Sequence, residues 1–223
     1  RDSSTSRGLG DVYKRQSIYY AKQYLKNTYV CSSDNYFVKN PFEKYVDESY
    51  YSAVYAEGHT EEWCIGQDAE GYINAVTIGG NDSWYMLGHT FWSEEFSSKF
   101  LKILEQIYDE NETQNLLWEG IYMRHLDELK MKIRKYPVDV IFEFDTLDEL
   151  RLFDNSYVNN SRSQILKQVA LELGCTEKDI VDVKARKIRN NEADGFTFKV
   201  FQNKYECVYE TMEIRDIKHE RNY

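Results

Sequence analysis

Helix-like and strand-like segments alternate along most of this chain, and this alternation limits the possible folds strongly. Residues 17–25 have the apolar spacing of a short helix, and the apolar stretch after them predicts a buried strand that ends at Asp34. Ser93 is a suitable N-cap for a helix in which Phe96, Phe100 and Ile103 recur at helical spacing. Because helices lead into strands, the sequence favours an α/β fold.

Two aspartates come directly after predicted strands. The stretch that ends at Asp34 is one, and residues 140–144 form the other, leading into Asp145. Thr146 and Glu149 then have the spacing of a capping box, which places Asp145 at a strand-to-helix junction. Ligands of open α/β sheets bind outside the carboxyl ends of strands, so the two acids are candidates for one shared metal ion. The alternative is that each is an ordinary cap or turn residue.

The remaining elements are predicted from periodicity and turn signals. Pro41 is suited to begin a short helix, and a further helix is expected over residues 115–129. Strands are expected over residues 50–56, 63–68, 72–78, 83–92 and 131–135. After Asp154 a polar linker leads to a helix over 163–173 and three short strands.

The chain is expected to have three parts. Residues 1–16 have no hydrophobic period, and their composition differs from that of the aromatic-rich residues after them, so we expect a non-native, chimeric segment. Residues 17–156 form the main domain, and residues 157–223 form a small α+β appendage.

Charge and hydropathy narrow the classes of partner. The net charge of -10 argues against nucleic acid and against an anionic membrane surface as the main partner. No apolar run approaches the roughly 20 residues that span a bilayer, and no signal peptide is evident, so we expect a cytoplasmic protein. The four cysteines are widely spaced and suggest free thiols and not a zinc site. The oligomeric state cannot be read from the sequence.

Several segments, in order and spacing, resemble the CTP:phosphocholine cytidylyltransferase branch of the bacterial nucleotidyltransferases. The resemblance extends from Ser17 to about Asp154. It implies a Rossmann-like α/β fold with a mixed central sheet, truncated at its N-terminus. It also implies transfer of CMP from CTP to phosphocholine, with Mg²⁺ held by Asp34 and Asp145 as catalytic residues. The segments that carry the resemblance are S-I-Y-Y-A, Y-V-C-S-S-D-N-Y-F, Y-Y-S-A-V-Y-A-E-G, E-E-W-C-I, D-S-W-Y-M-L-G-H-T-F-W, L-W-E-G-I-Y and V-I-F-E-F-D-T-L-D-E-L-R.

The chain departs from the family in its nucleotide loop. Family members have a glycine-rich loop of the form G-x-G-x-R and a later Lys-Pro, which hold the CTP phosphates, and neither occurs here. The only glycines before Asp34 are Gly8 and Gly10, inside the segment that we expect to be foreign. We therefore expect that the intact protein is an enzyme, and that the polypeptide as printed binds CTP poorly.

The resemblance also suggests substrate-binding residues. A quaternary ammonium is held by aromatic faces with a nearby carboxylate. The candidates are Trp84, Tyr85, Trp92 and Trp118, with Glu119, and Lys135 is a candidate for the acceptor phosphate. For any one aromatic residue, a place in the core is the alternative.

Four questions of function stay open at this stage. His89 and Arg134 have ordinary structural interpretations, and we give neither a role. The tail is similar to the opening of a choline-kinase-like domain, although a docking appendage explains it equally well. The alternative acceptors are phosphoethanolamine or a sugar 1-phosphate. A non-catalytic binding module is the alternative of another class.

Overall fold

The computed structural model describes residues 10–113, 116–187 and 193–217. Its contacts divide the chain into two compact units, one of which is Asp11–Glu143, here called the N-terminal unit. The other contains Phe144–Tyr223 and is called the C-terminal unit. This division falls between Glu143 and Phe144, and the domain boundary expected after residue 156 stays a prediction.

The N-terminal unit contains most of the helices and strands. Its helices are α1 (Gly10–Tyr20), α2 (Glu94–Ile107) and α3 (Trp118–Arg124). Its strands are β1 (Thr28–Cys31), β2 (Asn35–Phe37), β3 (Tyr50–Gln67), β4 (Ile73–Trp92), β5 (Lys132–Lys135) and β6 (Ile141–Glu143). Short 3₁₀ turns lie at Lys22–Tyr24 and Asn111–Thr113.

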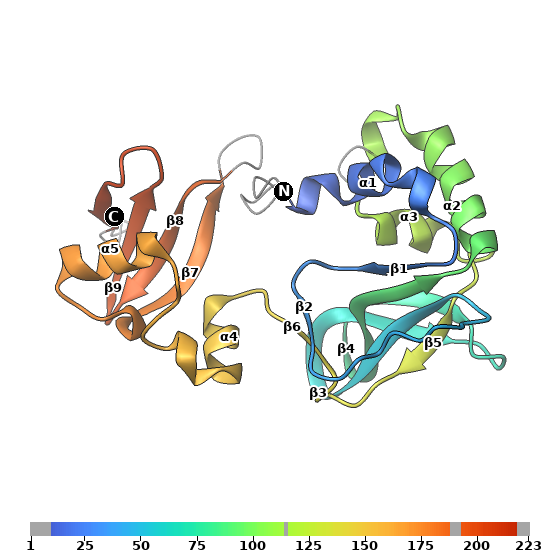
Figure 1. Cartoon of the computed structure of the whole chain (residues 1–223), viewed down its shortest axis with the longest axis horizontal. Helices are drawn as coiled ribbons and strands as arrows, with labels where there is room; N and C mark the ends of the chain where they lie inside the picture. The colour runs from blue at the N-terminus through green and yellow to red at the C-terminus, as the bar shows by residue number, and fades with distance from the viewer. Residues whose placement is uncertain (1–9, 114–115, 188–192, 218–223) are drawn as a thin grey trace, which may run out of the picture. The chain divides into compact units, whose positions relative to one another are not determined.

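The main sheet of this unit is mixed, as predicted. Its strand order is β1-β4-β3-β5, in which β4 runs antiparallel to β1 and β3, and β5 runs parallel to β3. A separate ribbon pairs β2 with β6. In Figure 1, α1, α2 and α3 lie together on one side of β1. The N-terminal unit is therefore an α/β fold built on a mixed sheet.

The strands β3 and β4 form one long hairpin, where the sequence predicted four shorter strands. Gly58 and Gly79 have positive φ angles of 76° and 75°, and Asp82 has a φ of 49°. Shifts in the pairing register lie close to these residues, so the polar Gly-rich stretches are bulges within continuous strands and not turns between strands. The predicted short strands were correct in position and wrong as separate elements.

The tip of this hairpin returns to β5. Lys132 pairs with Tyr50 at the start of β3 and also forms a bridge with Tyr72 beside the hairpin turn. The amide of Ile73 donates to the carbonyl of Met131 at 2.8 Å, which reinforces this second contact. One short strand thus lies between the base and the tip of the same hairpin.

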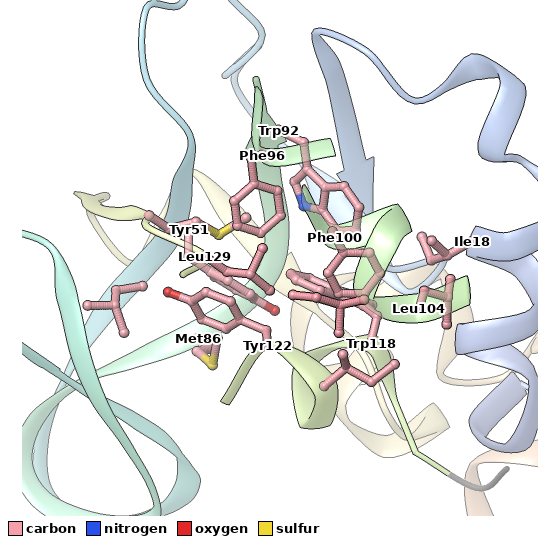
Figure 2. Close-up of a cluster of buried hydrophobic side chains, with 14 of the residues drawn as sticks. Ile18, Tyr51, Met86, Trp92, Phe96, Phe100, Leu104, Trp118, Tyr122 and Leu129 are labelled. Carbon is pink, nitrogen blue, oxygen red and sulfur yellow. The ribbon is translucent and has the colours of Figure 1, made fainter. Parts of the chain in front are cut away.

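The main core lies between this sheet and the helices, as Figure 2 shows. Ser93 is the N-cap of α2, as predicted, and its side chain accepts a hydrogen bond from the amide of Phe96. The helix contributes Phe96, Phe100 and Leu104 to the core, where Phe100 and Leu104 have no exposed surface. The third helix covers 118–124, so it is shorter than the helix expected over 115–129.

The opposite face of the sheet carries a second, smaller core and an extended segment, residues 38–49, here called the strap. Val54, Leu87, Val140 and Ile141 form this smaller core. The predicted helix at Pro41 is wrong. The strap contains neither helix nor strand, because the amide of Phe42 donates to Asn40 Oδ1 and that of Glu43 donates to the Tyr29 hydroxyl.

The first helix includes part of the segment that we expected to lie outside the fold. The structure begins α1 at Gly10, and Arg15 is buried with its Nη1 donating to Thr113 Oγ1 at 2.6 Å. Its guanidinium also lies over the Tyr108 ring, 4.8 Å from the centroid. Residues 1–9 lie outside the described residues. The foreign origin of 1–16 stays a prediction.

The C-terminal unit is a small α+β structure. Its helices are α4 (Leu147–Phe153) and α5 (Gln164–Leu173), and its strands are β7 (Ile180–Lys187), β8 (Ala193–Val200), β9 (Asn203–Val208) and β10 (Ile214–Asp216), paired in the order β10-β9-β8-β7. Short 3₁₀ turns lie at Asn155–Tyr157 and Glu177–Asp179. Arg151 of α4 is buried and donates to the carbonyls of Ile180 and Glu177, both at 2.6 Å. These bonds explain why α4 belongs to this unit.

Among the residues that the structure describes, no helix is long and apolar enough to cross a membrane.

Candidate functional site

Asp34 lies in a tight turn between β1 and β2. The amide of Ser32 donates to the carbonyl of Gly88 at 2.7 Å, and the amide of Asn35 donates to the carbonyl of Ser32 at 3.4 Å. Gly88 has a φ of +60°, and a side chain there would overlap Ser32 Oγ, so the turn packs directly against the backbone of β4. Asp34 therefore lies in a turn that is fixed against β4 by these contacts.

Glu143 is brought beside this turn by strand pairing. Asn35 lies opposite Glu143 in the β2–β6 ribbon, and Phe37 lies opposite Ile141. Directly opposite side chains on an antiparallel pair share one face, with Cβ atoms about 4.5–5.5 Å apart. A segment more than 100 residues downstream, as the numbering of Asn35 and Glu143 shows, is thus fixed next to Asp34.

Asp145 lies two residues after the end of β6 and precedes α4. The predicted capping box is confirmed: the Thr146 hydroxyl accepts from the Glu149 amide, and Glu149 Oε2 accepts from the Thr146 amide. The Asp145 amide also donates to Glu149 Oε2, at 2.9 Å. Hydrogen bonds from backbone amides fix the backbone at Asp145, and the Asp145 carboxylate takes no part in the capping box.

Asp34, Glu143 and Asp145 form a cluster of oxygen ligands. Each offers a carboxylate oxygen, and the three atoms lie within 4.8 Å of one another. Asp34 Oδ1 is buried and has no hydrogen-bond partner among the described residues. Because buried polar atoms normally have a partner, this oxygen is suited to bind a ligand. Hard cations such as Mg²⁺ prefer carboxylate oxygens. These residues therefore fit a magnesium ion.

Glu143 is a site residue that sequence reasoning missed. The pattern E-F-D puts Glu143 and Asp145 at alternate positions of an extended segment, and alternate side chains of a strand point to the same face. This two-residue spacing was the available signal. The sequence prediction took the acid that follows each expected strand, whereas Glu143 is the last residue of β6 itself.

Trp84 and Lys135 lie together at the edge of the main core. The Lys135 ammonium lies 4.8 Å from the centroid of the Trp84 ring, in a cation–π contact. Tyr85 belongs to the smaller core on the other face of the sheet, whereas Trp84 packs against the main core. Burial raises the pKa of Tyr85, and the charges of Glu62 and Glu143 add to the rise. The structure does not bring Trp84 and Tyr85 to one face.

Trp92 and Trp118 lie inside the main core, as Figure 2 shows. Trp92 is 0% exposed and packs edge-on against Trp118, with ring centroids 4.9 Å apart. Trp118 also stacks on Tyr51 at 5.7 Å, and the Tyr51 hydroxyl donates to Glu119 Oε1 at 3.3 Å. Burial, together with the smaller effect of the charges of Glu119 and Glu143, raises the pKa of Tyr51. Substrate contact by Trp92, Trp118 or Glu119 stays a prediction.

His89 lies under the strap and is fully buried. Its Nδ1 lies 2.6 Å from Ser52 Oγ, and its ring stacks on Tyr29 with centroids 5.5 Å apart. Burial lowers the pKa of His89 to about 4, and the charge of Arg134 contributes. Arg134 itself pairs with Glu43 at 2.7 Å and covers the Tyr50 ring at 3.8 Å. In the structure both residues contact side chains of the strap or of the strands beneath it.

Comparison with known proteins points to one group of enzymes. The chain is 25% identical over 145 residues to the choline-phosphate cytidylyltransferase of Streptococcus pneumoniae, covering 65% of this chain and 63% of that protein. It is 29% identical over 150 residues to the 2-aminoethylphosphonate cytidylyltransferase of Lancefieldella rimae, covering 66% and 61%. The chain thus spans just over three fifths of the length of these curated relatives. No protein-family model matches the chain.

The fold has a solved counterpart. The CTP:phosphocholine cytidylyltransferase from Streptococcus pneumoniae superposes with a TM-score of 0.61 at 24% identity, over 66% of this chain and 64% of that one. At this identity the superposition supports the fold, and the two sequence relatives support the branch. In sequence the chain is therefore similar to the cytidylyltransferase-like branch of the nucleotidyltransferases.

Proposed function

We propose that the protein to which this chain belongs transfers CMP from CTP to phosphocholine, giving CDP-choline and pyrophosphate. The observation that carries the proposal is the cluster of Asp34, Glu143 and Asp145, in which the buried Asp34 Oδ1 has no hydrogen-bond partner among the described residues. The names of both curated relatives add support, because each describes a cytidylyltransferase.

The reaction needs a phosphate oxygen of the acceptor to attack the α-phosphorus of CTP. A bond forms between that oxygen and the α-phosphorus, and the bond from the α-phosphorus to the bridging oxygen of pyrophosphate breaks. Mg²⁺ held by Asp34, Glu143 and Asp145 would supply neutralisation of the phosphate charges. The β2–β6 pairing, in which Asn35 lies opposite Glu143, fixes the neighbouring Asp34 and Glu143 before any substrate binds.

The acceptor's cationic head fits the face of Trp84. That ring already holds an ammonium, because the Lys135 side chain lies over it. A choline head in this place would take over the cation–π contact, and Lys135 would be released to pair with the acceptor phosphate. Trp84 and Lys135 would then bind opposite ends of one acceptor.

Other acceptors with the same charge pattern are the main alternatives. Phosphoethanolamine and 2-aminoethylphosphonate each carry an ammonium and a phosphorus oxyanion, and one curated relative is named for the second compound. A sugar 1-phosphate has no cation for the Trp84 ring. A non-catalytic binding module would keep the carboxylate cluster and turn over no acceptor.

The test is an acceptor panel with CTP and Mg²⁺. The chain as printed and the same chain extended by its native upstream sequence are each incubated with the four acceptors, and pyrophosphate release is measured with ³¹P NMR identification of the product. We expect CDP-choline from the extended protein and little turnover from the printed chain. Preference for another acceptor would correct the substrate, and metal binding without turnover of any acceptor would favour the binding module.

Two variants test the acceptor site in the active protein. Trp84→Ala should raise KM for phosphocholine with little change in KM for CTP, because only the acceptor head is affected. Tyr55→Phe is the matched control, since Tyr55 packs edge-on against Trp84 at 5.4 Å and this variant keeps the ring. An unchanged KM for phosphocholine in Trp84→Ala would exclude Trp84 from the acceptor site.

A further inference from the structure

The side chain of Asn35 has one satisfied end and one unsatisfied end. Its Nδ2 donates to the carbonyl of Leu87 at 2.9 Å, which identifies Oδ1 as the opposite, accepting end of the amide. Oδ1 is buried and has no donor among the residues that the structure describes. A buried acceptor without a donor is destabilising, so its retention calls for a physical explanation.

Asn35 lies at the carboxylate cluster. It is the residue after Asp34 and lies opposite Glu143 in the β2–β6 ribbon, so its side chain shares a face with that of Glu143. Asp34 Oδ1 is likewise buried without a partner among the described residues, which puts two acceptors without donors on consecutive residues. Asp34 Oδ1 is thus suited to bind a cation directly, and Asn35 Oδ1 is suited to accept from a donor that accompanies the cation.

The packing around Asn35 holds its amide against β4. A Cβ on Gly88 would collide with Ser32, whereas it would meet Asn35 Oδ1 at 3.5 Å, an ordinary contact distance. Because Gly88 has no side chain, the Ser32–Asn35 turn approaches β4 closely, and the Leu87 carbonyl can anchor the Asn35 amide. The amide is thus fixed in one orientation by the strand beneath it.

We infer that Asn35 is a positioning residue of the magnesium site. Its Nδ2 ties the turn that carries Asp34 to β4, and its Oδ1 accepts a hydrogen bond from the hydration shell of the cation. Mg²⁺ bound by a few carboxylates keeps several waters, and each water has protons that need acceptors. The inference rests on the proposed function only through the metal site, and it needs neither CTP nor an acceptor.

The test is Mn²⁺ binding, with Mn²⁺ as a spectroscopic substitute for Mg²⁺. Free Mn²⁺ is measured by electron paramagnetic resonance as the purified 223-residue chain is titrated. Loss of such an outer partner typically weakens metal affinity roughly 10–100-fold, and we expect this for Asn35→Ala. Ser33→Ala is the matched control, because Ser33 is an exposed residue of the same turn, and it should bind as the unaltered chain does.

A second variant separates the acceptor from the anchor. Asn35→Asp loses the donor to Leu87 but keeps an oxygen at the acceptor position, so it should retain Mn²⁺ affinity. Circular dichroism checks that each variant is folded. If Asn35→Ala is not folded, Asn35→Ser replaces it in the comparison with Asn35→Asp. The serine variant is expected to show the same loss of Mn²⁺ affinity.

Three outcomes are decisive. Weaker binding by Asn35→Ala with binding retained by Asn35→Asp supports the inference. Affinity unchanged in Asn35→Ala but lost in Asp34→Asn overturns the role of Asn35 and leaves the metal site standing. Absence of Mn²⁺ binding by the unaltered chain overturns the metal site of the proposed function, and the role of Asn35 with it.

Discussion

Replacing Gly88 by alanine tests whether the turn that carries Asp34 packs closely on β4. Gly88 has a φ of +60°, where a residue with a Cβ costs about 1–2 kcal/mol. The new Cβ would also overlap Ser32 Oγ and lie 2.9 Å from Ser32 Cβ, and overpacking of this kind costs about 1–3 kcal/mol. We therefore expect Gly88→Ala to lower the free energy of unfolding of the N-terminal unit by about 2–5 kcal/mol.

Gly58→Ala is the matched control. Gly58 has a φ of +76°, and a Cβ there would have no neighbour within 4 Å, so the variant carries the backbone cost alone. The difference between the two variants isolates the collision with Ser32, at about 1–3 kcal/mol. Ser32→Gly in the Gly88→Ala background should recover that difference, which makes the comparison a double-mutant cycle.

Urea unfolding monitored by tryptophan fluorescence is the assay. The four tryptophans, Trp63, Trp84, Trp92 and Trp118, all belong to the N-terminal unit, so the signal reports this unit. Equal losses in Gly88→Ala and Gly58→Ala, within about 0.5 kcal/mol, would refute the close packing of Ser32 on Gly88.

Burial and hydrogen bonding give three further predictions. His89 has a pKa of about 4 in the fold against an ordinary 6.5, so the unfolded state binds more protons between these values. The unfolding free energy should fall as pH decreases through that window, and an equally steep fall in His89→Gln would contradict this origin. Arg151→Met should lose about 2–4 kcal/mol of C-terminal-unit stability by stranding the carbonyls of Ile180 and Glu177, seen as faster amide exchange in β7. Phe100→Ala should lose about 3–5 kcal/mol in the urea assay, whereas Tyr20→Ala, at a position 77% exposed, should change stability by less than about 0.5 kcal/mol.

Local patterns in the sequence predicted the elements whose causes are themselves local. The helix that begins after Ser93 and the capping box at Thr146 depend on residues within one helical turn, and both are present. The helix expected at Pro41 failed because the partners of that segment are distant. Phe42 packs edge-on against Tyr29, and Glu43 pairs with Arg134, which no local pattern contains.

The site was partly predictable for the same reason. Asp34 and Asp145 are found beside each other because each lies just after a strand, and Glu143 joins them through a pairing with Asn35 that spans the chain. The aromatic candidates lie in different places: Tyr85 belongs to the smaller core, Trp84 packs against the main core, and Trp92 and Trp118 lie inside the main core. Trp84 and Tyr85 are consecutive on one strand and therefore face opposite sides, a consequence that already follows from the strand expected over residues 83–92.

The contact of β5 with both the base and the tip of the β3–β4 hairpin restricts how related sequences can vary in length. Each residue removed from a strand shortens it by about 3.3 Å. A hairpin two residues shorter on each side would leave Tyr72 short of its bridge to Lys132. Insertions and deletions in homologues should therefore collect at the bulges near Gly58 and Asp82, where an extra residue is absorbed without moving the tip. Conservation of hairpin length, more than of hairpin sequence, should mark chains that share this closure.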